Sequence, residues 1–264
     1  MPGPRVHFHL MQSYGPHQVR TQWVQSTRPK IPELEARIEQ AWREAHERPG
    51  VRLFDSPMCR LESFDADREL LLSFSLTSYK IFVGTHYFDP SSAEPFGKNS
   101  RANAIGISAV VQSADGFFLL GRRNATVAHY ADRVHTFAGA LEPPEAGDVF
   151  AAMRRELDEE LHLTGEQISE ITLLGLVEDD SLHQPELVFD VVVNLKRQEI
   201  AARLDGAEHS ALVAVESEPK RLRDAVAQAS LTPVAAAALL LCGRRRQGAA
   251  WFDDAAGAVN LPGR

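Results

Sequence analysis

Three glutamates lie close together near the middle of the chain: Glu156, Glu159 and Glu160. Their i, i+3 and i+4 spacing places them on one face of a helix, within about one turn. Unpaired like charges this close repel one another, and a folded chain rarely keeps them together without a cation. Hard divalent ions such as Mg²⁺ bind carboxylate oxygens and retain waters, which suits chemistry on phosphates. The spacing therefore predicts a divalent-metal enzyme that acts on phosphates.

The residues around these glutamates predict an amphipathic helix from Val149 to Leu161, with Asp148 as its N-cap. A loop that contains two prolines and a glycine, residues 142–148, precedes the helix, and residues 134–138 are typical of a strand. The apolar side of the helix consists of Phe150, Met153, Leu157 and Leu161.

Other segments of the second part of the chain indicate a sheet covered by helices. Asp115-Gly116 is a hairpin-turn signal between two predicted strands. Thr232-Pro233 is expected to open a late helix, and Gly243 is expected to close it. Strands and helices interleave without a strict βαβ order, which favours a mixed sheet. The predicted strands are residues 104–112, 117–121, 171–177 and 187–195.

The first part of the chain carries a separate set of predicted elements. Residues 31–46 have the spacing of a helix, and residues 52–64 and 69–76 are typical of two strands. Residues 77–80 are expected to open a short helix, with Thr77 or Ser78 as its cap. Residues 88–101 are rich in Pro, Ser, Gly and Asn and are typical of a linker, so we expect a domain boundary near residue 100.

Composition excludes several classes of protein. The chain has 264 residues, of which 44% are hydrophobic and 24% charged, as in a globular protein with a real core. The net charge is −8 and no long Lys/Arg block occurs, so we expect no nucleic-acid partner. The longest apolar run, residues 234–242, is far shorter than a membrane span, so we expect no membrane partner. The two cysteines lack metal-type spacing and the first residues lack a signal-peptide pattern, which favours the cytoplasm.

The segment Arg155-Glu156-Leu157-x-Glu159-Glu160 resembles the core of the Nudix box, G-x5-E-x7-R-E-U-x-E-E-x-G-U, where U is aliphatic. Counting from Gly139, Glu145 occupies the first glutamate position, but nine residues then precede Arg155 where the pattern has seven. A two-residue insertion in the loop 142–148 accounts for this difference. His162 occupies the position of the last glycine.

Residues 53–61 and 70–85 are similar to the N-terminal part of the Nudix-type UDP-glucose (UDP-sugar) pyrophosphatases. The resemblance implies an α/β fold: a Nudix α/β/α sandwich with a mixed sheet over residues 101–246. A smaller α+β domain, residues 1–100, would precede it and shape the substrate pocket, and residues 247–264 would form a C-terminal tail. It also implies cleavage of UDP-glucose or UDP-galactose to UMP and sugar 1-phosphate with Mg²⁺, with Mn²⁺ as the alternative ion. The expected partner is a small-molecule nucleotide-sugar, and the oligomeric state stays open.

The same resemblance implies roles for particular residues. Glu156 and Glu160 would be direct metal ligands and Glu159 a further one, and Arg155 would brace a helix glutamate. The base would be metal-bound hydroxide or a carboxylate from a later loop, among Glu178, Asp179, Asp180 and Glu186. Substrate contacts are expected from Thr77, Ser78, Tyr79, Lys80, Arg122 and Arg123.

Each role has an alternative. Arg122 and Arg123 also suit a surface pair, and Tyr79 also suits packing in a short capped helix. Within the class, the substrate could instead be ADP-ribose or a dinucleotide. Outside it, the altered loop and the missing glycine suit a non-catalytic Nudix-like binding module. The intact set of three glutamates argues against that module, because a pure binder does not need to concentrate carboxylates.

Overall fold

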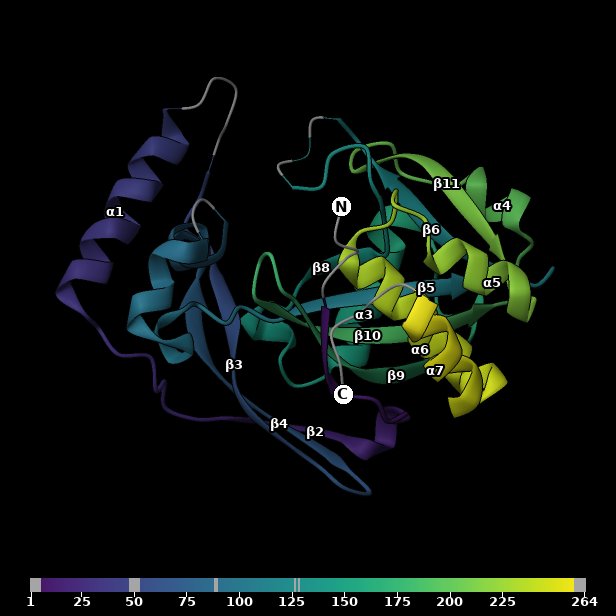
Figure 1. Cartoon of the computed structure of the whole chain (residues 1–264), viewed down its shortest axis with the longest axis horizontal. Coiled ribbons are helices and arrows are strands. Elements are labelled where there is room, and N and C mark those ends of the chain that lie inside the picture. The colour runs from purple at the N-terminus through teal and green to yellow at the C-terminus, as the bar shows by residue number, and fades with distance from the viewer. Residues whose placement is uncertain (1–5, 48–52, 88–89, 126, 128, 259–264) are drawn as a thin grey trace.

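The computed structural model describes residues 6–47, 53–87, 90–125, 127 and 129–258 (Figure 1). Its centre is a large mixed sheet in which neighbouring strands follow the order β1-β9-β10-β5-β6-β11, with β8 beside β5 and β7 beside β6. The pair β10 and β5 is parallel, and the other pairs are antiparallel. A smaller three-stranded sheet has the order β2-β4-β3.

The bounds of the elements are as follows. The large sheet contains β1 (Val6–Leu10), β5 (Gly106–Gln112), β6 (Phe117–Arg123), β7 (Val134–His135), β8 (Phe137–Ala140), β9 (Ile168–Asp179), β10 (Gln184–Val193) and β11 (His209–Glu216). The small sheet contains β2 (Val19–Trp23), β3 (Pro57–Ala66) and β4 (Leu70–Ser78). The helices are α1 (Pro32–His46), α2 (Tyr79–Phe82), α3 (Val149–Leu161), α4 (Arg197–Ala201), α5 (Pro219–Val226), α6 (Pro233–Gln247) and α7 (Ala249–Ala258).

Helices cover both faces of the large sheet, so the expected sandwich is confirmed. In β5, Ile107 and Ala109 pack in one hydrophobic cluster with Phe150 and Leu157 of α3. Val110, whose side chain points to the opposite face, packs in a second cluster with α6. This alternation is what a strand buried on both faces requires. Figure 1 shows α5, α6 and α7 in front of the sheet and α3 behind it.

The predicted helix over 149–161 is confirmed as α3, with both ends as expected. The Asp148 carboxylate accepts hydrogen bonds from the backbone N–H groups of Phe150 and Ala151, each at 3.0 Å. His162 ends the helix in the left-handed conformation, with φ 49° and ψ 44°. A residue that follows the last helical turn often adopts this conformation, and glycine does so at least steric cost.

The late helix differs from its prediction at its C-terminus. It begins as expected, with Thr232 accepting from the Ala235 N–H, but it continues beyond Gly243 to Gln247. A Cβ at Gly243 would lie 2.0 Å from Cζ3 of Trp251, so this glycine allows α7 to pack closely on α6. The expected C-terminal tail therefore begins with a helix whose Phe252 is buried in the core.

The two sheets share a hydrophobic core. Leu61, Leu72 and Phe74 of the small sheet belong to the same buried cluster as α3, and β1 pairs with β9 at the edge of the large sheet. The expected linker contains short 3₁₀ helices, including Lys98–Ser100, and its Ser100 is buried. The domain boundary near residue 100 stays a prediction, and the shared cluster indicates that the parts unfold together.

The short helix α2 begins near its predicted start but is capped differently. Ser78 precedes it without a side-chain hydrogen bond, and the Asp55 carboxylate accepts from the Lys80 N–H at 2.9 Å instead. Within the described residues, none of the helices has the length and apolar character needed to cross a membrane.

We predict that His162→Gly stabilises the protein by about 0.5–1 kcal/mol, because glycine adopts the left-handed conformation without steric cost. His162→Ala is the matched control. Both variants lose the contact between His162 Nδ1 and the Asp158 carbonyl at 3.1 Å. Only the alanine variant also keeps the steric cost, so it should be less stable than wild type. Urea unfolding of the three proteins measures the order, and a destabilised His162→Gly would contradict this account of the helix end.

Candidate metal centre and active site

The carboxylate of Glu156 is buried against strand β8. Its residue is 8% exposed, and a Cβ at Gly139 would lie 1.9 Å from Glu156 Oε1. Only glycine leaves room for the carboxylate at this point of β8. Burial raises the pKa of Glu156 to about 7, with Arg155 opposing the shift and Glu160 adding to it. A carboxylate in such a place needs a positive partner in order to stay ionised.

Arg155 links the glutamates of the helix to the preceding loop. Its guanidinium donates to Glu156 Oε1 at 2.8 Å and to Glu159 Oε2 at 2.8 Å. It also makes a two-point contact with Glu145, through Nε to Oε1 and through the second nitrogen to Oε2 at 3.1 Å. Glu145 lies in the short turn Pro143–Glu145 of the loop that carries the two-residue insertion. Arg155 is therefore occupied by three carboxylates and braces α3 against this loop.

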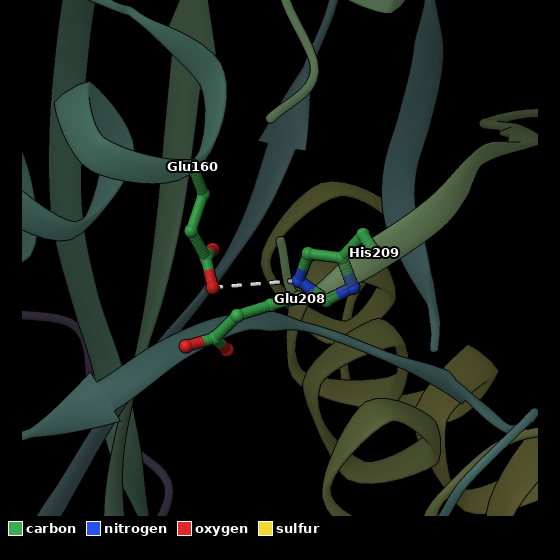
Figure 2. A group of neighbouring side chains, drawn as sticks. All are labelled: Glu160, Glu208 and His209. Atoms are coloured by element: carbon green, nitrogen blue, oxygen red, sulfur yellow. Dashed lines mark ion pairs between the residues drawn. The ribbon is translucent and has the colours of Figure 1, made fainter. Parts of the chain in front are cut away.

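Glu160 lies one helical turn beyond Glu156 and faces a second group of residues. Figure 2 shows its carboxylate pointing from α3 toward His209, with the Glu208 carboxylate beside them. The distance from Glu160 Oε1 to His209 Nε2 is 3.4 Å, and one ligand atom from each of the three residues lies within 4.8 Å of the others. Burial raises the pKa of Glu160, and His209 opposes the shift.

The buried glutamates fit a divalent cation. Glu160 Oε2 is buried and has no hydrogen-bond partner in the part of the chain that the structure describes, although buried polar atoms in folded proteins are nearly always satisfied. Two carboxylates four residues apart, both less than a tenth exposed, repel each other in a weakly polar environment. Carboxylate oxygens are the donors that hard divalent ions prefer. Glu159, by contrast, is exposed and turned toward Arg155.

A cavity of about 160 Å³ adjoins β8. Ala138 and Gly139 of β8 line it, as do Arg123, Asp179 and Glu186. Burial raises the pKa of Glu186 to about 7, the charge of Asp179 adds to the shift, and the charge of Arg123 opposes it. The cavity therefore brings one cation and two carboxylates to the strand that also faces Glu156 and Glu160.

Three of the candidate bases follow one another at the end of strand β9 and have different surroundings. Asp179 lines the cavity and accepts hydrogen bonds from Tyr130 and from the Ser181 N–H, the latter at 2.7 Å. Its neighbours Glu178 and Asp180 contact other groups, His9 at 2.8 Å and His7 at 2.7 Å. Successive side chains of a strand point to opposite faces, which separates Glu178 from Asp179, and Asp180 lies in the turn after β9. Of the three, only Asp179 lines the cavity.

The predicted substrate contacts are placed in two regions. Arg123 lines the cavity, whereas Arg122 donates to the Asp132 carbonyl at 3.0 Å. None of residues 77–80 lines the cavity beside β8. Lys80 pairs with Glu39 of α1, and Tyr79 packs against Trp42 with ring centroids 6.2 Å apart. The Thr77 hydroxyl is buried without a hydrogen-bond partner.

Glu208 and His209 were absent from the residues expected at the site. They lie far beyond α3 in the sequence, and they reach Glu160 because β11 pairs with β6, which also pairs with β7, the short strand that precedes β8. No local spacing marks such a pair. The one related signal is Gly121 of β6, where a Cβ would lie 2.3 Å from His209 Nδ1.

A larger cavity of about 580 Å³ lies between the small sheet and the end of β9. Leu61 and Phe64 of β3, Leu176 and Glu178 of β9, and Arg101 contribute to its lining. Its volume is within the range of small-molecule pockets, roughly 300–1,000 Å³.

The chain is similar in sequence to proteins of known name and in fold to solved structures. The uridine diphosphate glucose pyrophosphatase NUDT22 of Mus musculus is 28% identical, covering 73% of this chain and 74% of the relative. The protein of the same name from Homo sapiens is 26% identical, covering 73% of this chain and 76% of the relative. Among solved structures, a mutT/nudix family protein from Listeria innocua is 16% identical with a TM-score of 0.41, covering 55% of this chain and 94% of that chain.

The model of the NUDIX domain family matches residues 102–246, which is more than half of the chain. This range contains β8, α3, the Glu160–Glu208–His209 group and the cavity beside them. The chain therefore belongs to the NUDIX domain family and is a Nudix diphosphatase, a hydrolase.

Proposed function

We propose that this Nudix hydrolase cleaves the diphosphate of a UDP-sugar, such as UDP-glucose or UDP-galactose, to UMP and sugar 1-phosphate with the help of Mg²⁺. The observation that carries the metal-dependent reaction is the pair of buried glutamates, Glu156 and Glu160, that faces β8 beside the cavity. The names of the relatives, uridine diphosphate glucose pyrophosphatase, support the choice of substrate. We propose that the protein acts in the cytoplasm.

The residues divide the work of the reaction. Glu156 and Glu160 hold the metal, and Arg155 fixes Glu156 and the loop residue Glu145. A bound divalent ion neutralises diphosphate charge and lowers the pKa of bound water. Arg123 in the cavity is positioned for a phosphate oxygen. Of the two carboxylates in the cavity, we favour Glu186 as the base, because a pKa of about 7 suits proton transfer near neutral pH.

The size of the cavity limits what it holds. Pockets that enclose a whole small molecule have volumes of roughly 300–1,000 Å³, so the space of about 160 Å³ beside β8 suits the diphosphate alone. The uridine and the sugar would then lie outside it. A contact of uracil with Tyr79, which is partly buried against Trp42, stays part of this proposal.

The sequence also allowed another substrate class and a non-catalytic module. ADP-ribose or a dinucleotide would use the same metal site with a different base contact. A non-catalytic binding module would not need two buried carboxylates beside a cavity, so the burial of Glu156 and Glu160 argues against it.

Glu160→Gln should lower kcat by at least about a hundredfold, or roughly 2.7 kcal/mol in barrier, because it removes a metal-binding charge without changing shape. Asp158→Asn is the matched control, since Asp158 is exposed on the same helical turn. Steady-state kinetics at saturating Mg²⁺ measures both variants. Wild-type activity of Glu160→Gln would show that this carboxylate is not a ligand.

UDP-glucose should be cleaved faster than ADP-ribose, and EDTA should abolish both activities. Attack at phosphorus leaves the glycosidic bond intact, so the products should be UMP and glucose 1-phosphate rather than UDP and glucose. Product identification with both substrates, with and without EDTA, provides the measurement. Faster cleavage of ADP-ribose would overturn the uridine assignment and keep the Nudix chemistry, whereas activity in EDTA would overturn the metal mechanism.

The pKa of Glu156 predicts a pH-dependent stability in the absence of metal. Its value of about 7 lies above the ordinary 4.5, so the native state binds more protons than the unfolded state between these values, and stability falls as pH rises through this window. Glu156→Gln removes the titration, so its advantage over wild type should grow from pH 5 to pH 7.5. Urea unfolding in EDTA measures the difference, and saturating Mg²⁺ should reduce it. An advantage that does not depend on pH would contradict the shift.

A further inference from the structure

The group Glu160, Glu208 and His209 combines two carboxylates with an imidazole. Glu160 comes from the last turn of α3, Glu208 from the residue before β11, and His209 from its first position. Figure 2 shows the three side chains converging from the helix and the strand. No histidine was expected at the metal site from the sequence, whereas the donor set here includes one.

His209 is held in place by packing rather than by hydrogen bonds. It is 1% exposed, and neither ring nitrogen has a hydrogen-bond partner among the described residues. Its ring stands edge-on to Phe137, with centroids 5.4 Å apart, and it fills the space left by Gly121. A buried imidazole normally has a partner for at least one nitrogen, so its absence points to a missing ligand.

The distances within the group are close to those of donors around a shared ion. Glu160 Oε1 and His209 Nε2 are 3.4 Å apart, longer than the 2.7–2.9 Å or so of a charge-assisted hydrogen bond. Donors about 2.1 Å from one ion lie roughly 3 Å apart when adjacent and about 4 Å apart when opposite. The three ligand atoms, all within 4.8 Å of one another, fall close to this range.

We propose that His209 and Glu208 complete a metal site with Glu160, and that this site takes a divalent transition ion such as Mn²⁺ in preference to Mg²⁺. The proposal rests on the metal-dependent function proposed above and adds the identity of the ion. Mg²⁺ favours oxygen donors and retains its waters, whereas an imidazole donor favours transition ions, among which Mn²⁺ also suits carboxylate oxygens. Two carboxylates and a neutral imidazole also balance the charge of one divalent ion.

The alternative is a buried ion pair between protonated His209 and Glu160, with no metal at this point. The metal site and the ion pair predict different contacts between a bound Mn²⁺ ion and His209. In the metal site, the His209 nitrogen is bonded directly to the ion, and its nuclear spin couples to the Mn²⁺ electrons. In the ion pair, no histidine nitrogen contacts the ion.

The test uses the full-length protein without substrate. Mn²⁺ binding is titrated by electron paramagnetic resonance, and Mg²⁺ is measured by competition against Mn²⁺. Pulsed spectra of the Mn²⁺ complex report coupling to ¹⁴N. We expect nitrogen coupling in the wild type and its loss in His209→Gln. The same variant should bind Mn²⁺ at least about tenfold more weakly than the wild type does, with little change in Mg²⁺ affinity. Glu208→Gln should weaken both ions, and Asp158→Asn should bind both as wild type does.

The possible outcomes distinguish a failure of this proposal from a failure of the metal-dependent function on which it rests. Tight Mn²⁺ binding without nitrogen coupling in the wild type overturns the role of His209 and leaves the metal-dependent hydrolase intact, a result that needs no variant to fold. Coupling that persists in His209→Gln assigns the nitrogen to another histidine and overturns the proposal. A wild type that binds neither ion, or a Glu160→Gln variant that binds both normally, overturns the proposed metal function as well.

Discussion

The desolvation of two like charges, Glu156 and Glu160, is the constraint on which the rest of the site depends. Both carboxylates face β8 from α3, and burial is the largest cause of the raised pKa of each. The α/β/α sandwich causes this burial. The face of α3 that places Phe150 and Leu157 in the core also turns the glutamates toward the sheet. Gly139 then provides space for one carboxylate, and Gly121 provides space for the histidine beside the other.

The two buried glutamates, Glu156 and Glu160, have different neighbours. Arg155 contacts the exposed Glu159, the buried Glu156 and the loop residue Glu145, so it fixes the helix and the inserted loop together. Among the described residues, no arginine holds Glu160 in this way, and its second oxygen has no hydrogen-bond partner. The two buried glutamates therefore differ in their contacts: Arg155 holds Glu156, whereas Glu160 contacts His209 through one oxygen only.

Short-range signals in the sequence predicted the local parts of this arrangement. The cap at Asp148 and the apolar spacing fix α3, because both act within a few residues. Gly243 was misread as a helix end, since a glycine that stops a helix and a glycine that admits Trp251 look alike in one sequence. Longer-range features escaped prediction: the contact of His209 with Glu160 depends on the pairing of β11 with β6, which no local spacing encodes. Strand β9 is an intermediate case. Extending the predicted strand by two residues to its observed end at Asp179 would have set Asp179 apart from Glu178 by alternation alone.

The edge strand β1 has a consequence for the order in which a nascent chain acquires its structure. Val6 pairs with Asp179, so β1, which is synthesised before β9, has no partner in the large sheet until β9 has been made. At synthesis rates of about 5–20 residues per second, the interval is roughly nine to thirty-five seconds. Strand β1 must wait unpaired through this time while the small sheet and β5 are already available. Closure of the large sheet at this edge is therefore a late step, and the edge of β9 is open to mispairing until β1 pairs with it.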